Sequence, residues 1–90
     1  MNKKHARTLE SIFKIPVQST VPWKDCEQLL QSLGAKISEG SGSRVRIELK
    51  GVKAVFHRPH PRKEIDKAAL VSLRKFLENA EITPKKKDKP

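Results

Sequence analysis

The feature that most constrains the fold is a pair of alternating runs, RVRIEL and VKAVFH, separated by Lys50-Gly51. Alternation of apolar and polar residues with a period of two is typical of a strand that buries one face. A two-residue connection that contains glycine is typical of a tight antiparallel hairpin. The two runs therefore predict a β-hairpin over residues 44–57 in which Arg44 pairs with His57 and Leu49 with Val52.

The predicted register makes the two faces of the hairpin chemically different. One face consists of apolar pairs that can pack against helices, namely Val45–Phe56, Ile47–Ala54 and Leu49–Val52. The opposite face pairs Arg44 with His57, Arg46 with Val55 and Glu48 with Lys53. We therefore expect this second face to be basic, with an imidazole beside a guanidinium.

Helical periodicity appears before the hairpin. Residues 4–13 permit a short helix. An apolar stripe that starts at Trp23 predicts a second helix, with Pro22 as its first residue and Gly34 as its stop. We expect the capping oxygen of this second helix to come from Thr20 or a neighbouring residue.

The remaining segments complete an α+β order. Residues 35–39 can form a short strand before a Gly-Ser-Gly-Ser turn, and Asp66 is suited to cap a final helix that runs to about Asn79. The order predicts a two-layer α+β domain in which helices cover one face of a three-stranded antiparallel sheet, plus an extra N-terminal helix. We divide the chain into an N-terminal helix and linker (1–21), a single domain (22–83) and a basic disordered tail (84–90).

Positive charge is concentrated in the hairpin and in the segment that follows it. The chain has 20 Lys plus Arg against 10 Asp plus Glu, and residues 44–63 hold seven of these cations with Glu48 as their one carboxylate. This concentration favours a polyanionic partner, either a nucleic acid or an acidic protein. One cysteine and three scattered histidines predict neither a disulfide framework nor a zinc site. The sequence also has no apolar run typical of a membrane span or a signal peptide, so we expect a cytoplasmic protein without a metal or small-molecule cofactor.

Three segments together resemble the HicA family of bacterial toxins. They are the WxxCxxLLxxLGA helix, the GSGSRVRIEL strand and the FHRPHPRKEIDKAALVSLRKFLENAEI segment, and the resemblance covers roughly residues 8–83. It implies a fold similar to the double-stranded-RNA-binding domain, cleavage of messenger RNA without a metal, and a HicB antitoxin that covers the active surface.

One position departs from the pattern of that family. Its members typically carry a catalytic histidine just after a glycine–serine pair at the start of the second strand, whereas this chain reads Gly40-Ser41-Gly42-Ser43-Arg44. Ser43, or less closely Gly42, stands where the imidazole would be. Either His57 or His60 supplies the imidazole, or the protein binds RNA without cutting it efficiently.

The chemical requirements of RNA cleavage without a metal indicate which residues are candidates for the site. The reaction needs a base for the 2′-hydroxyl proton, cations to hold the phosphate, and an acid for the leaving oxygen. We interpret His57 as the base and His60 as an acid or a substrate contact. The predicted RNA-binding residues are Ser43, Arg44, Arg46, Lys53 and Arg58, of which Arg44 and Arg46 act as phosphate clamps.

Aromatic residues are too few to suggest a base-stacking platform. We expect Trp23, Phe56 and Phe76 to lie in the core, together with Cys26 as a small core residue. RNA recognition would then depend on phosphate, sugar and shape. The leading hypothesis is a messenger-RNA endoribonuclease of a toxin–antitoxin pair. The alternatives are a noncatalytic RNA-binding module, or a protein-interaction domain that docks an acidic antitoxin.

Overall fold

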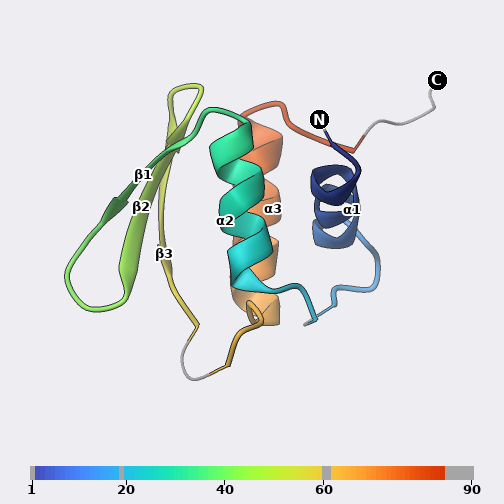
Figure 1. The fold of residues 1–90 in the computed structure, drawn as a ribbon, viewed down its shortest axis with the longest axis horizontal. Coiled ribbons are helices and arrows are strands. Elements are labelled where there is room, and N and C mark those ends of the chain that lie inside the picture. Colours follow the sequence, from blue (N-terminus) through green and yellow to red (C-terminus); the bar gives the residue numbers. More distant parts are fainter. Residues whose placement is uncertain (1, 19, 60–61, 85–90) are drawn as a thin grey trace.

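The structure is a computed structural model that describes residues 2–18, 20–59 and 62–84. The elements, in chain order, are α1 (Lys3–Ile12), α2 (Trp23–Ser32), β1 (Lys36–Glu39), β2 (Arg44–Leu49), β3 (Val52–His57) and α3 (Lys67–Asn79). All three helices lie on one side of the sheet, with α1 on the far side of α2 and α3 from the strands (Figure 1). This arrangement confirms the predicted α+β class with an extra N-terminal helix. Beyond Pro84, the predicted basic tail lies outside the described residues.

The β2–β3 hairpin has the predicted register. Arg44 pairs with His57 and Leu49 pairs with Val52. The two turn residues have positive φ angles, 51° at Lys50 and 82° at Gly51, as a type I′ turn requires. Strand β1 pairs antiparallel with the other side of β2, so the order is β1-β2-β3 and β2 is the central strand.

The core lies between the sheet and the two helices α2 and α3. The Phe56 ring lies between two other aromatic rings, with its centroid 6.1 Å from that of Trp23 and 6.1 Å from that of Phe76. All three side chains are buried, as predicted, and Cys26 is fully buried. The apolar face of the hairpin thus packs on the helical stripes, which leaves its basic face to solvent.

The N-terminus of α2 differs from the prediction. Pro22 occupies the N-cap position, and no side chain caps the helix. The exposed Thr20 does not supply an oxygen there. Instead, the backbone N–H of Trp23 donates to the carbonyl of Lys63, 2.9 Å away. The segment before α3 therefore provides by tertiary contact the acceptor that we expected from a local side chain.

The N-terminus of α3 follows the prediction. Asp66 is its N-cap, and the carboxylate accepts a hydrogen bond of 2.7 Å from the backbone N–H of Ala69. This bond satisfies one of the backbone donors that the first turn of a helix leaves without a partner. The helix thus begins where the sequence indicates.

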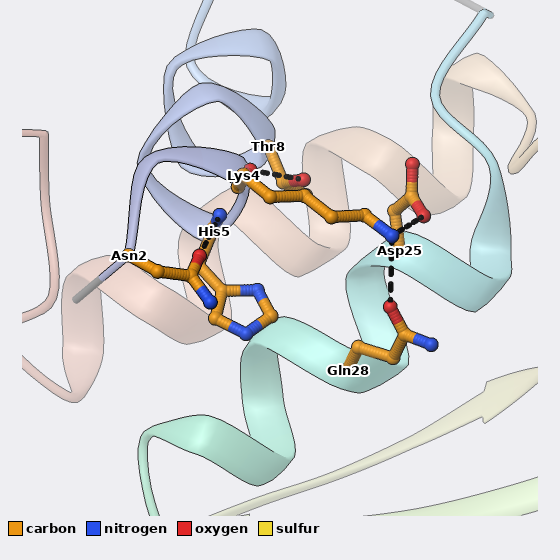
Figure 2. Close-up of polar contacts among 6 residues, drawn as sticks. All are labelled: Asn2, Lys4, His5, Thr8, Asp25 and Gln28. Atoms are coloured by element: carbon orange, nitrogen blue, oxygen red, sulfur yellow. Dashed lines mark hydrogen bonds and ion pairs between the residues drawn. The ribbon is translucent and has the colours of Figure 1, made fainter.

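Helix α1 is joined to α2 and α3 by apolar and polar contacts. Its buried side chains include Leu9 and Ile12. The ammonium group of Lys4 lies 3.7 Å from a carboxylate oxygen of Asp25 and donates to the amide oxygen of Gln28 at 3.3 Å (Figure 2). These contacts attach the first turn of α1 to α2.

The C-terminal end of α1 is held by a side chain of α3. The guanidinium of Arg74 donates to the carbonyls of Ile12 and Lys14, with shortest distances of 2.9 Å to each, and lies 5.8 Å from the centroid of the Phe13 ring. Carbonyls at a helix C-terminus lack intrahelical donors, and a cation suits the negative end of the helix dipole. The N-terminal helix is therefore an integral third layer of the domain.

Candidate nucleic-acid interface

The open sheet face, as we call the surface turned away from α2 and α3, carries the outward side chains of all three strands. Strand alternation and register assign its members, which are Lys36 and Ser38 of β1, Arg44, Arg46 and Glu48 of β2, and Lys53, Val55 and His57 of β3. All of them are exposed except Glu48, which is half-buried. The predicted basic side of the hairpin is thus a solvent-facing surface.

The start of β2 is the most cationic end of the open sheet face. Arg44 lies directly opposite His57 on β3. Arg46 follows on the same face about 7 Å further along the strand, a spacing that allows both guanidinium groups to contact one nucleic-acid backbone. The structure therefore brings together the predicted base and both predicted phosphate clamps.

The opposite end of the open sheet face is less positive. Glu48 lies between two lysines, since it pairs with Lys36 on one side and with Lys53 on the other. Its carboxylate offsets one of these two charges. Lys53 is exposed as predicted, but the electrostatic attraction for a polyanion is strongest at the Arg44 end.

The turn before β2 brings Ser43 to the same end of the sheet. The backbone N–H of Arg58 donates to the carbonyl of Ser43 at 2.8 Å, and the N–H of Gly40 donates to the carbonyl of Arg44 at 2.9 Å. Gly42 has a φ of 67°, which favours glycine at this position. Ser43 is exposed and directly precedes Arg44 at this end of the sheet.

Arg58 differs from the other predicted RNA contacts because its guanidinium already has partners. It donates to Glu27 of α2 at 2.9 Å and to Glu39 of β1 at 2.7 Å. The hydrogen bonds to Glu27 and Glu39, in that order of importance, raise the pKa of Arg58 above its usual value. Arg58 thus connects the ends of β1 and β3 with α2.

Sequence reasoning missed the two acidic partners of Arg58. Glu27 and Glu39 are 31 and 19 residues away along the chain, and a local pattern does not indicate ion pairs at such separations. In the described conformation Arg58 holds Glu27 and Glu39 with two of its five N–H donors, and its contact with RNA stays a prediction.

A shallow hollow of about 550 Å³ lies over the middle of the open sheet face. Its lining includes Arg46 and Lys53, together with three residues that we did not predict as site members, Lys36, Ser38 and Val55. The period-two alternation of residues 36–39 could have placed Lys36 and Ser38 on this face. The side chain of Val55 is 58% exposed, so the hollow has an apolar floor within a basic border.

The remaining predicted site residue cannot be placed. His60 lies outside the described residues, and His57 is therefore the candidate imidazole that the structure assigns to the open sheet face. Within residues 2–18, 20–59 and 62–84, no cluster of three or more His, Cys, Asp or Glu side chains could hold a metal ion. In the same residues, no helix is long and apolar enough to cross a membrane.

Comparison with known protein families identifies the family of the chain. A family model described as the HicA toxin of bacterial toxin–antitoxin systems matches residues 23–82, from the first residue of α2 to beyond the end of α3. The chain belongs to the HicA toxin family. Neither the curated proteins nor the solved structures gave a significant match.

The HicA match includes the whole open sheet face and leaves α1 outside. The matched segment contains Arg44, Arg46 and His57, and also Arg58 with both of its carboxylate partners. Helix α1 precedes this segment but packs on two of the matched helices. The chain is therefore a HicA-family toxin domain to which an N-terminal helix is added on the side away from the open sheet face.

Proposed function

We propose that this HicA-family toxin is an endoribonuclease that cleaves messenger RNA without a metal and is neutralised by a HicB-like antitoxin. The observation that carries the proposal is the direct pairing of Arg44 with His57 on an exposed sheet face, with Arg46 next along β2. Arginines can hold a phosphate while an imidazole exchanges protons near neutral pH. An RNA target is consistent with action in the cytoplasm.

The cleavage step assigns one role to each of these groups. The His57 imidazole takes the proton of a ribose 2′-hydroxyl, and the 2′-oxygen forms a bond to the adjacent phosphorus. The bond from phosphorus to the 5′-oxygen breaks, and that oxygen takes a proton from a general acid, either His60 or water. The products are a 2′,3′-cyclic phosphate and a free 5′-hydroxyl. Arg44 and Arg46 stabilise the negative charge that builds on the phosphate.

The decisive test is RNA cleavage by a His57→Ala variant in the presence of a chelator. We expect cleavage by the unmodified protein and a loss of at least about a hundredfold in the variant, the usual contribution of general acid–base catalysis. His5→Ala is the matched control, because His5 lies on α1, away from the sheet. Undiminished cleavage by His57→Ala would remove His57 from the mechanism. Circular dichroism checks that both variants are folded.

A noncatalytic RNA-binding module is the second candidate function. The observation that favours it is the identity of Ser43, an exposed hydroxyl at the position where the HicA family typically has its catalytic histidine. A serine hydroxyl does not exchange protons near neutral pH as an imidazole does, so Ser43 cannot replace the histidine as a base. The same chelator experiment separates the two functions, because RNA that is bound and stays intact would support the noncatalytic module.

A further inference from the structure

The outer edge of β3 is an unpaired strand edge at the border of the open sheet face. In the described sheet, β3 pairs with β2 on one side, and no strand lies on its other side. A strand edge of six residues presents a row of free backbone donors and acceptors, which another extended segment can bind. The edge is therefore a candidate docking site for an additional strand.

The hydrogen-bond pattern identifies the free groups. The N–H of Arg58 donates to the carbonyl of Ser43 at 2.8 Å, so these two opposite residues form a hydrogen-bonded pair. Hydrogen-bonded and non-hydrogen-bonded pairs alternate along an antiparallel ladder. It follows that Lys53, Val55 and His57 direct their backbone N–H and C=O groups away from β2.

A groove runs beneath this edge, on the side of the sheet that faces α3. It has a volume of about 200 Å³ and a mixed lining. The apolar part is the buried Phe76 with the half-buried Val52 and Ala54, and the polar part is Lys53, Ser72, Lys75 and Asn79. Val71 is 48% exposed one helical turn before Lys75, on the same side of α3. A strand added to β3 would therefore have cations and the apolar side chains of this groove within reach.

We propose that the free edge of β3 binds an extended, acidic segment of a protein partner as a fourth strand of the sheet. Successive side chains of such a strand point to opposite faces. Those on the open sheet face would lie beside Lys53 and His57 and should be acidic, whereas those on the other face would enter the groove lined by Phe76 and should be apolar. The recognised pattern is an alternation of acidic and apolar residues.

A second copy of this chain fits the edge poorly. Antiparallel pairing of two β3 strands centred on Val55 would place Lys53 of each copy opposite His57 of the other, and basic groups directly opposite each other destabilise a sheet. The net charge of +10 on each chain adds further repulsion. The charges favour an acidic partner over self-association.

The edge of β1 fits an acidic segment less well than the edge of β3. β1 has four residues, and the N–H of Gly40 donates to the carbonyl of Arg44. By the same alternation, Ile37 and Glu39 turn their backbone groups to the outer edge of β1. The outward backbone groups of β1 thus belong to Ile37 and to Glu39, whose carboxylate is already bound by Arg58, and neither residue offers a cation to an acidic segment.

A strand bound at β3 would also control access of RNA. Its acidic side chains would lie beside two members of the open sheet face, Lys53 and His57, and would compete with phosphates for them. This consequence depends on the proposed function, but binding of the strand does not. The two can therefore be measured separately.

The test uses the full chain and a seven-residue peptide that alternates Glu and Val. We expect saturable binding, with shifted amide signals and slowed hydrogen exchange for Lys53, Val55 and His57 in NMR spectra. A control peptide with the same residues in two blocks should bind at least about fivefold more weakly, because it cannot direct acids to one face and valines to the other. Equal binding of both peptides would overturn the proposal.

Backbone methylation of the peptide tests strand addition directly. Only alternate amides of an added strand point toward β3. N-methylation of one alternate set should abolish binding, and methylation of the other set should change it by less than about twofold. The same effect from both sets would contradict strand addition.

A matched pair of variants tests the edge itself. Val55→Pro removes an outward N–H but no bond of the β2–β3 ladder, and proline is tolerated at such edge positions. We expect it to weaken peptide binding by at least about fivefold, while Val55→Thr, which retains the N–H, stays within about twofold. Unchanged binding to Val55→Pro, or self-association that depends on Val55, would overturn the proposal.

The outcomes also separate the two proposals. RNA cleavage that depends on His57, without peptide binding, would reject strand addition and leave the proposed function intact. Peptide binding to a protein that leaves RNA intact would support strand addition and reject the endoribonuclease.

Discussion

Replacement of Arg44 by alanine should change the salt dependence of RNA binding by a predictable amount. Arg44 is exposed at the most basic end of the open sheet face. Among the described residues, ion pairs with carboxylates occupy Lys4 and Arg58, and none involves Arg44. Its positive charge is therefore free to displace a counterion from a phosphate when RNA binds.

The magnitude follows from the loss of one phosphate contact. Each contact contributes about 0.7 to the slope of log affinity against log salt for a single strand, and about 0.9 for a duplex, so Arg44→Ala should make the slope shallower by about that amount. Over a fourfold rise in salt, from about 50 to about 200 mM, the affinity of Arg44→Ala for a single strand should fall about 2.6-fold less than that of the reference protein, and for a duplex about 3.5-fold less.

The assay is a titration of labelled RNA at several salt concentrations. All proteins in it carry His57→Ala, a background in which we expect the RNA to remain intact. The matched control is Arg7→Ala, because Arg7 is an exposed arginine on α1, on the far side of the helical layer from the sheet. A slope that Arg44→Ala leaves unchanged, or that Arg7→Ala alters equally, would refute the assignment of phosphate contacts to the open sheet face.

Three further predictions concern stability, each measured by urea unfolding. Arg58→Met should lower the free energy of unfolding by about 1 kcal/mol, because it leaves the partly buried Glu27 and the mostly exposed Glu39 without their cation. This loss of stability should be smaller at high salt, which screens the ion pairs. An unchanged midpoint would show that the ion pairs do not stabilise the fold. Asp66→Ala should cost about 1 kcal/mol by removing the cap of α3, and Asp66→Asn should retain most of that stability. Equal losses in these two variants would contradict the capping role. Burial raises the pKa of Cys26 from 9.0 to about 12, so the folded protein keeps the thiol neutral where the unfolded chain ionises it. The neutral thiol contributes fully to the free energy of unfolding below pH 9.0, and this contribution is lost as the pH rises through about 12. At pH 10 the reference protein should have lost about 1 kcal/mol more free energy of unfolding than Cys26→Ala, relative to each protein at neutral pH. Parallel pH profiles for the two proteins would contradict this assignment.

The hairpin shows how far local pattern determines the fold. Two runs with a period of two and a Lys50-Gly51 connection admit one pairing that buries the apolar side chains, because a slip by one residue would turn them all to solvent. For this reason the sequence predicted the pairing of Arg44 with His57 and the exposure of both. The helix boundaries and the Asp66 cap depend on equally local signals.

The departures from prediction arise where residues distant in the chain meet. The first turn of α2 uses the carbonyl of Lys63 in place of a local cap, and Arg58 is held by Glu27 and Glu39. Neither partner can be inferred from nearby sequence, because each contact exists only after α2, the sheet and the segment before α3 have packed together.

The sequence by itself determined which residues face away from the core, since hydrophobic burial permits one orientation of each strand and helix. Charge and residue type along β2 and β3 then made one face of the sheet basic. Only the tertiary structure decided which cations on or beside that face are free of carboxylates and can bind an anion. Arg44 and Arg46 stand free of the described ion pairs, while Arg58 is bound to carboxylates from two other elements. The physical reason is that alternation acts between neighbouring residues, whereas ion pairing depends on distances in space that packing alone establishes.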